Sequence, residues 1–209
     1  MKAFFKAALL AGAAWSVIPS LAVAQTAPAE GSVEEVVVTA RRREESLKDV
    51  PVAVTAVSGE RLAATGAVDI TNLQQTTPNL TVQVARGSNS TLISFIRGVG
   101  QQDPLWGFEP GVGLYIDDVY VARPQAAVLD IFDVQRLEVL RGPQGTLYGR
   151  NAIGGAIKYV TAKIEGEPEI KLKGNLGSYN QRDLVASAKA KVNDYVGLGL
   201  TWATFNRDG

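Results

Sequence analysis

Side chains able to perform acid/base or nucleophilic chemistry are scarce in this sequence. The 209 residues include no cysteine and no histidine, which excludes disulfides, thiolate metal sites, most zinc sites and every histidine-based catalytic triad. Two carboxylates stand next to each other at Asp117 and Asp118. Because neighbouring residues of a strand point to opposite faces, these carboxylates do not converge on one substrate, and they predict the turn of a hairpin.

Glycines are dense in residues 141–155 (RGPQGTLYGRNAIGG), where they permit tight backbone turns. This spacing differs from a Walker loop, because no Gly-Lys-Ser/Thr follows. The pairs Gly98/Gly100 and Gly111/Gly113 lack the third glycine of a dinucleotide fingerprint, and no Gly-x-Ser-x-Gly elbow is present. We therefore expect no enzyme activity, no cofactor and no metal site.

The pattern of helix signals and strand-like runs predicts an α+β domain over residues 48–165, with a mixed β-sheet and short helices. A strand is predicted over Pro51–Val57, then a short helix over Gly59–Thr65 that Ser58 can cap. A second helix is predicted near Asp69–Thr76, before Pro78. The remaining pattern is β-rich and predicts strands at Thr81–Ala85, Leu92–Ile96, Val112–Ile116, Val119–Ala122 and Arg136–Leu140.

The first 24 residues are typical of a secretory signal. Lys2 and Lys6 form a basic start, an apolar stretch follows, and Ala22-Val23-Ala24 is a small-residue cleavage site. A transmembrane anchor is the alternative, but Pro19 and Ser20 interrupt the apolar stretch before it reaches the ~20 residues that a spanning helix needs. We expect export and cleavage.

Residues 25–47 are predicted to be a flexible segment, since their composition offers little apolar surface. Within them Val36–Thr39 favour an extended backbone, and this short strand needs a partner. It could pair with the domain that follows, or it could add to the sheet edge of another protein. Glutamates flank the arginines at 41–43, so a solvated linker is expected there rather than a phosphate or lipid site. The 21 basic and 21 acidic residues of the chain suggest no nucleic-acid partner.

From Glu169 onward apolar residues occur at every second position, which is typical of strands with one apolar face. Residues 166–209 therefore predict about three amphipathic membrane strands, with Trp202 at a lipid interface. Membrane-spanning barrel strands take ~9 to 11 residues, and about three of them cannot close a barrel, so these would be the first antiparallel strands of an incomplete outer-membrane β-barrel. The chain is expected to be a fragment that does not conduct a solute by itself.

Three stretches resemble the plug of TonB-dependent outer-membrane receptors: Ile96–Gly100 (IRGVG), residues 111–124 (GVGLYIDDVYVARP) and residues 133–161 (DVQRLEVLRGPQGTLYGRNAIGGAIKYVT). The resemblance implies that residues 35–40 (EVVVTA) are similar to the TonB box, which these receptors offer to TonB and its inner-membrane energising complex. The implied TonB-binding residues are Glu35, Val36, Val37, Val38, Thr39 and Ala40.

The resemblance also implies roles inside the plug. Arg97, Glu138 and Arg141 match charged residues that in the family contact one another or the barrel wall, and would seat and release the plug. The implied backbone positions are Gly98, Gly142, Gly145, Gly149, Gly154 and Gly155. One departure is Lys158-Tyr159, where relatives commonly have Asn-Ile or a similar pair.

The loop 101–110 resembles plug loops that face the extracellular solute. Its candidate contacts are Gln101, Gln102, Trp106 and Phe108, although the two rings could instead pack against plug or barrel.

The resemblance implies an outer-membrane location, lipid contact, and a plug that gates energy-coupled uptake of a scarce solute such as an iron-siderophore complex. The sequence leaves the solute unidentified. A soluble periplasmic module that binds TonB or a small ligand is the alternative, and a secreted hydrolase is a third, disfavoured by the missing catalytic groups.

Overall fold

The structure is a computed structural model that describes residues 36–105, 107–125, 127–164 and 166–208. A five-stranded mixed sheet forms its centre, with the strand order β3-β9-β10-β7-β8. The parallel pair is β10 with β7, and the other pairs are antiparallel. The strands are β3 (Ala53–Ser58), β7 (Val112–Ile116), β8 (Val119–Tyr120), β9 (Val134–Arg141) and β10 (Gly155–Thr161). The predicted mixed sheet with short helices is confirmed.

One face of this sheet is apolar and covered on its whole length. Leu137, Val139 and Ile157 alternate along β9 and β10 toward this face and are completely buried. They share a core with α2 (Gly59–Ala64), η1 (Ile70–Gln75) and a three-stranded sheet of β4 (Leu80–Val84), β5 (Leu92–Ile96) and β6 (Val99–Gly100).

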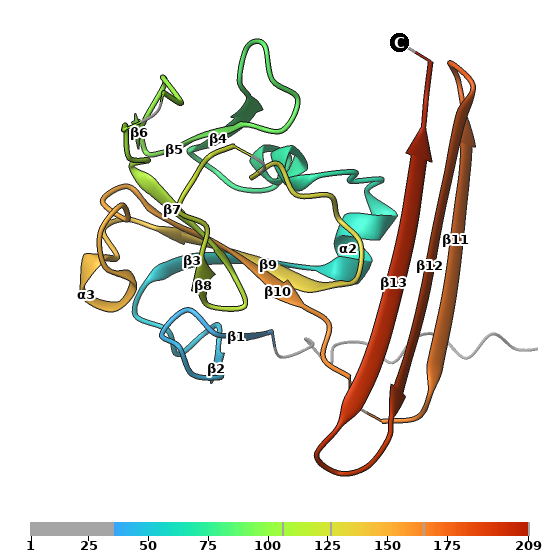
Figure 1. Ribbon diagram of the computed structural model, residues 1–209. Coiled ribbons are helices and arrows are strands. Elements are labelled where there is room, and N and C mark those ends of the chain that lie inside the picture. The colour runs from blue at the N-terminus through green and yellow to red at the C-terminus, as the bar shows by residue number, and fades with distance from the viewer. Residues whose placement is uncertain (1–35, 106, 126, 165, 209) are drawn as a thin grey trace, which may run out of the picture. The chain divides into compact units, whose positions relative to one another are not determined.

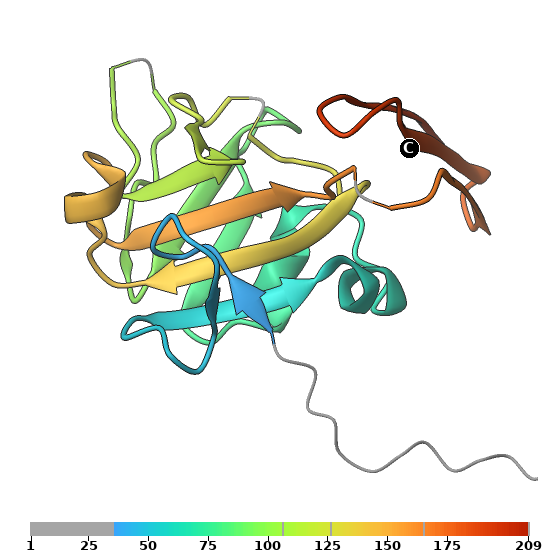
Figure 2. The same ribbon diagram turned by 90° about the horizontal axis from the view of Figure 1, so that it is seen from below.

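The opposite face is covered by the segment before β3. Leu140 and Ala156 point to this side and form a second cluster with Val38 and Ala40. Val38 belongs to a two-stranded hairpin of β1 (Val37–Val38) and β2 (Glu45–Ser46). Figure 1 labels these elements, and Figure 2 shows β1 crossing in front of the central sheet when it is seen from below.

Local sequence explains both short helices. Ser58 caps α2 by accepting a hydrogen bond from the Arg61 backbone N–H at 3.3 Å, and the helix stops before Gly66, as predicted. Asp69 caps the next element in a capping box with Asn72. This element is a 3-10 helix, whereas α2 of the same length is α-helical; it begins with two β-branched residues, Ile70 and Thr71, which lower the α-helix propensity.

The turn between β7 and β8 confirms the hairpin predicted at the paired carboxylates. Asp117 and Asp118 both have a positive φ, 44° and 68°, as the two central residues of a tight hairpin turn require. Aspartate tolerates this backbone because its short side chain can form local hydrogen bonds. Here the Asp117 carboxylate accepts hydrogen bonds from the backbone N–H and the hydroxyl of Thr161, at 2.9 and 2.6 Å.

The last part of the chain forms its own antiparallel sheet. Its strands are β11 (Glu169–Gly177), β12 (Gln181–Lys191) and β13 (Gly197–Asn206), in sequence order. This confirms the predicted antiparallel strands. Large apolar side chains alternate along these strands and are exposed, among them Ile170, Leu172, Leu198, Leu200 and Trp202.

No helix in the described ranges is both long enough and apolar enough to cross a membrane.

The central core generates a stability prediction. Replacing Ile157, which is fully buried, with alanine is expected to lower the free energy of unfolding by about 2–5 kcal/mol, because it leaves a cavity in the core that Ile157 shares with Leu92 of β5. The matched change at Ile153, which is 66% exposed, should stay within about 0.5 kcal/mol. Urea unfolding followed by circular dichroism measures both. Equal effects of the two substitutions would contradict this core assignment.

Candidate functional site

The docked segment, residues 36–47, is the part of the structure that the sequence analysis places in contact with a partner. Val38 and Ala40 are buried at 0% and 1% exposure against the central sheet. The prediction of a flexible segment reaching residue 47 therefore differs from the structure, because two small apolar side chains find a complementary apolar surface on β9 and β10. Of the TonB-box-like residues, Glu35 lies outside the described residues, and Val36 and Val37 are exposed.

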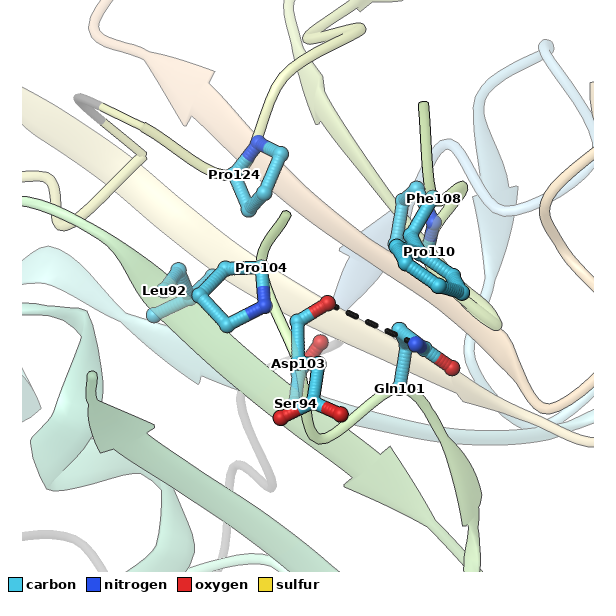
Figure 3. Close-up of a pocket in the computed structure, with 8 residues that line it drawn as sticks. All are labelled: Leu92, Ser94, Gln101, Asp103, Pro104, Phe108, Pro110 and Pro124. Carbon is cyan, nitrogen blue, oxygen red and sulfur yellow. Dashed lines mark hydrogen bonds between the residues drawn. The ribbon is translucent and has the colours of Figure 1, made fainter. Parts of the chain in front are cut away.

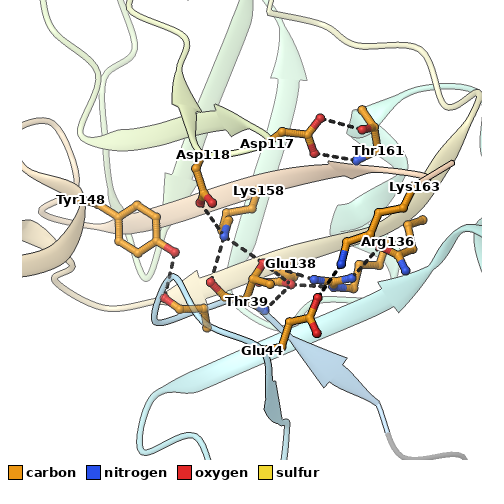
Figure 4. Close-up of polar contacts among 12 residues, drawn as sticks. Thr39, Glu44, Asp117, Asp118, Arg136, Glu138, Tyr148, Lys158, Thr161 and Lys163 are labelled. Carbon is orange, nitrogen blue, oxygen red and sulfur yellow. Dashed lines mark hydrogen bonds and ion pairs between the residues drawn. The ribbon is translucent and has the colours of Figure 1, made fainter. Parts of the chain in front are cut away.

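Thr39 is the point at which the docked segment is tied to the sheet (Figure 4). Its backbone N–H donates to Oε1 of Glu138 at 2.7 Å, and its hydroxyl donates to the same oxygen at 3.1 Å. Nζ of Lys158 donates to the carbonyl oxygen and to the hydroxyl oxygen of Thr39, both at 2.9 Å. The backbone N–H and the carbonyl oxygen of Thr39 are thus both bound by charged side chains, which form stronger hydrogen bonds than neutral groups do. The carbonyl oxygen also accepts a hydrogen bond from the Arg42 backbone N–H at 2.9 Å.

Lys158 is a buried cation with a complete set of acceptors. It is 1% exposed, and its third hydrogen-bonding partner is the Asp118 carboxylate at 2.8 Å. An ammonium group has three donors, so the two oxygens of Thr39 and the one of Asp118 satisfy it fully. Lys158 stands directly opposite Glu138 in the β10–β9 register. The residue that departs from the family pattern therefore serves a contact within the domain.

Glu138 is completely buried and pairs with Arg136, whose Nε lies 2.7 Å from Oε1. Removing one partner of such a pair leaves an uncompensated buried charge, which is strongly destabilising. Among the described groups, Oε2 of Glu138 has no hydrogen-bond partner. The buried carboxylate thus depends on Arg136 and Thr39 alone for its hydrogen bonds.

The three charged residues predicted to seat the plug are not brought together. Side chains alternate along β9, so Glu138 faces the docked segment whereas Arg141 points to the other face. Arg97 has a φ of 53° in the turn between β5 and β6, and its guanidinium lies near Gly142 on that other side. Within the described part of the chain, Nε of Arg141 is buried without a hydrogen-bond partner. Contacts of these residues with a surrounding wall stay a prediction.

Tyr148, in α3 (Gly145–Tyr148), joins the glycine-rich loop to the docked segment. Its hydroxyl donates to the carbonyl oxygen of Ala40 at 2.8 Å, and its own carbonyl oxygen accepts from the Tyr115 hydroxyl at 2.8 Å. The Arg42 guanidinium lies 5.3 Å from the centre of its ring. Burial, with the nearby carboxylates of Asp118 and Glu138, raises the pKa of Tyr148 well above its usual value.

The glycines of the loop serve backbone geometry. A Cβ on Gly155, whose φ is +147°, would lie 2.2 Å from the carbonyl oxygen of Leu140. A Cβ on Gly154 would lie 2.8 Å from the carbonyl oxygen of Val99. Gly145 opens α3 and has open space beside it. The remaining predicted positions have a positive φ, namely Gly98, Gly142 and Gly149.

The loop predicted to face the solute packs over β5 (Figure 3). Gln101, Asp103 and Phe108 line a hollow of about 10 Å³, which is the size of one water molecule. The loop is held by Gln125, whose side-chain amide donates to the carbonyl oxygen of Pro104 at 2.7 Å. Phe108 is half exposed, and Trp106 lies outside the described residues. Phe108 thus lies against other residues of the plug at this hollow. Contact with a solute stays a prediction for Gln101, Gln102, Trp106 and Phe108.

Two of the three arginines in the turn of the docked segment pair with one glutamate of the same turn. Arg41 and Arg43 both bind Glu45, with nitrogen–oxygen distances of 2.5 and 2.6 Å. These two hydrogen-bonded guanidinium groups lower the pKa of Glu45 to about 2. The arginines thus bind a neighbour in the hairpin rather than forming an open anion site.

Sequence reasoning missed the cluster itself. Arg136, Tyr148 and Asp118 had no assigned role toward the docked segment. Arg136 and Tyr148 contact it across 97 and 108 positions of the chain, and Asp118 reaches it through Lys158. One signal was present, since a lysine in the middle of an otherwise apolar strand such as β10 requires buried partners. No cluster of three or more metal-ligating side chains occurs in the described ranges.

The arrangement has counterparts among known proteins. The family described as the TonB-dependent Receptor Plug Domain matches residues 46–156. The pesticin receptor of Yersinia enterocolitica is 33% identical over 165 residues, which are 78% of this chain and 23% of that protein. The vitamin B12 transporter of Vibrio vulnificus is 27% identical over 72% of this chain and 24% of its own length.

A solved structure with the same fold is the ferric yersiniabactin uptake receptor FyuA from Yersinia pestis. It superposes with a TM-score of 0.63 and 29% sequence identity, over 72% of this chain and 24% of that one. The chain thus spans about a quarter of the length of the proteins it matches.

The two glycines at the ends of the loop predict opposite mutational effects. Gly155→Ala should lower the free energy of unfolding by about 3 kcal/mol, because the new methyl group meets backbone and the φ is unfavourable. Gly145→Ala should be neutral or slightly stabilising, since the space is open and alanine favours a helix. Thermal unfolding of the two variants tests this, and a neutral Gly155→Ala would contradict it.

The Glu45 carboxylate predicts an acid-sensitive turn. Its pKa is depressed in the folded state, so its contribution is present above the unfolded value near 4.5 and is lost as the pH falls through about 2. A carbon-13 NMR titration of the Glu45 carboxyl group should give a midpoint near pH 2, and Arg41→Met should move that midpoint upward. A midpoint above pH 4 in the unmodified chain would show that the two ion pairs do not form.

Proposed function

This chain belongs to the TonB-dependent receptor plug family, and on that premise we propose that it gates the energy-coupled uptake of a scarce solute across the outer membrane. In this proposal residues 35–40 are the coupling strand, which TonB captures by strand addition. The family consists of transport receptors, so the chemistry is mechanical and not enzymatic. TonB would pull on the coupling strand, and the plug would move or remodel.

The observation that carries the proposal is the hydrogen-bond pattern of the β1–β2 hairpin. The Leu47 N–H donates to the Val36 carbonyl oxygen at 2.8 Å, which makes Val36 and Val38 the hydrogen-bonded positions of the pair. In an antiparallel pair the intervening residue directs its N–H and C=O away from its neighbour strand. Val37 therefore presents its backbone groups to the outer edge of β1, and its side chain is exposed. An edge with this property is what strand addition requires.

The class of solute follows only from the relatives. Their names include a pesticin receptor, a vitamin B12 transporter and a ferric yersiniabactin uptake receptor. These names favour a solute that is larger and scarcer than common nutrients, and an iron-siderophore complex is our proposal for this chain. Loop 101–110 is the candidate contact, with Gln101 and Phe108 at a surface hollow.

The proposed location is the outer membrane, after export directed by residues 1–24, which lie outside the described residues. The exposed alternating side chains of β11–β13 support it, because Leu172 and Leu198 are 74% and 64% exposed and would contact lipid. The plug would face the periplasm with its coupling strand. The alternative of a soluble periplasmic module is not favoured, since the matched proteins are receptors and a transporter.

Val37→Pro tests capture of the coupling strand. Proline removes the backbone donor on the outer edge of β1, while the hydrogen bonds to β2 come from the neighbouring positions. We expect binding to the periplasmic domain of TonB to weaken by on the order of tenfold or more, measured by isothermal titration calorimetry. Val37→Ala keeps the N–H and serves as the control. If Val37→Pro binds TonB as well as the control does, the edge is not the site of capture.

A further inference from the structure

Lys158 connects two parts of the plug that lie far apart in the sequence. One side of its ammonium group binds the Thr39 carbonyl and hydroxyl oxygens in the docked segment, and the other binds the Asp118 carboxylate at the tip of the β7–β8 hairpin (Figure 4). The lysine is 1% exposed, whereas the Asp118 side chain is 46% exposed. An accessible turn and a docked strand thus share one buried cation.

The contacts of Thr39 compete with the proposed strand addition. Strand β1 ends at Val38, and Thr39, the next residue, begins the turn to β2, where its carbonyl oxygen accepts a hydrogen bond from the Arg42 backbone N–H at 2.9 Å. The N–H of Thr39 donates to the Glu138 carboxylate at 2.7 Å, and its carbonyl oxygen accepts from Lys158 at 2.9 Å in addition to the turn hydrogen bond. A partner strand can meet Val37, but it cannot extend its hydrogen-bond ladder to Thr39 while these two side chains hold it.

We propose that Lys158 is a positioning residue that ties the Asp117–Asp118 turn to the coupling strand, so that displacement of this turn frees Thr39 for capture. The inference rests on the proposed coupling role of residues 35–40. It adds a route by which the state of the plug reaches that strand: the turn moves, Lys158 loses its Asp118 contact, and its hold on Thr39 weakens.

The balance of interactions favours such a device over a permanent attachment. The apolar part of the docking near Thr39 consists of two small side chains, Val38 and Ala40. Asp118 is half exposed, so water can solvate it once it leaves Lys158, whereas Lys158 without Asp118 keeps a charge with incomplete partners. A buried charge that loses one partner is costly, which makes the contact sensitive to small shifts of the turn.

Thiol protection at position 38 measures release directly, because the chain contains no other cysteine. Val38→Cys introduces a nearly isosteric thiol at a completely buried position, and a maleimide can react with it only when the strand undocks. In the full chain, Lys158→Met should accelerate this reaction by on the order of tenfold, since methionine keeps the apolar stem and removes the hydrogen bonds to Thr39. Lys48→Met, at an exposed lysine near the same segment, should change nothing.

The turn is tested by Asp118→Asn, with Asp117→Asn as the matched control. Asparagine tolerates the positive φ at both positions. Asp118→Asn removes the negative charge that pairs with Lys158 but leaves a neutral oxygen acceptor, so it should accelerate the reaction at position 38 by less than Lys158→Met does. It should add nothing in the Lys158→Met background, because both changes act through one contact. Asp117→Asn keeps an oxygen acceptor for Thr161 and should leave the reaction rate unchanged.

A second thiol probe distinguishes local release of the docked segment from a general loss of stability. Val139→Cys lies on the opposite face of β9 and is also completely buried. The proposal requires that Lys158→Met exposes position 38 and leaves position 139 protected. Equal acceleration at both positions, or no acceleration at position 38, would overturn it.

Measuring TonB binding by the same variants tests this inference separately from the proposed function. If both hold, Lys158→Met should tighten binding of the periplasmic domain of TonB by about the same factor as it accelerates labelling, because a larger fraction of chains presents the strand. Labelling that rises while no variant binds TonB would reject the coupling role and keep the connection. TonB binding without any change in labelling would reject the connection alone.

Discussion

The burial of three charged side chains on one face of the central sheet is the constraint on which the rest of the structure depends. Arg136, Glu138 and Lys158 are each 9% exposed or less. Charges in such a place are tolerated only when they are paired and hydrogen-bonded. Thr39 of the docked segment supplies hydrogen-bonding groups to all three, so the sheet needs the segment as much as the segment needs the sheet.

This dependence explains why a segment of small and charged residues is ordered at all. Burying one valine side chain contributes about 1.5–3 kcal/mol, whereas ordering each residue's backbone costs about 1–2 kcal/mol. Apolar contact at Val38 and Ala40 therefore does not offset the ordering of twelve residues alone. Charged hydrogen bonds at Thr39 and the hydrogen bond from Tyr148 to Ala40 add to the stabilisation, as does the packing of Leu47, and hydrogen bonds of this kind can be exchanged for those of another strand.

Local sequence predicted the elements well where a local cause exists. Ser58 predicted the start of α2, and Asp117 with Asp118 predicted the hairpin turn, because capping and turn chemistry depend on adjacent residues. The strand order and the docking of residues 36–47 could not be predicted in this way, since they depend on contacts between residues about a hundred positions apart. Glu138 was singled out by resemblance, and within the described residues its hydrogen-bond partners are Thr39 and Arg136, whereas its predicted contacts with a barrel wall stay a prediction.

The central claim is that the plug itself holds the edge of the coupling strand through Thr39. Native-state amide hydrogen exchange at Thr39 and Val37 tests it most directly, because one N–H is bound to a buried carboxylate and the other is directed to the open edge. The account predicts that the Thr39 amide is protected well beyond the Val37 amide in the absence of TonB. Exchange of Thr39 at the rate of an unfolded chain would contradict it.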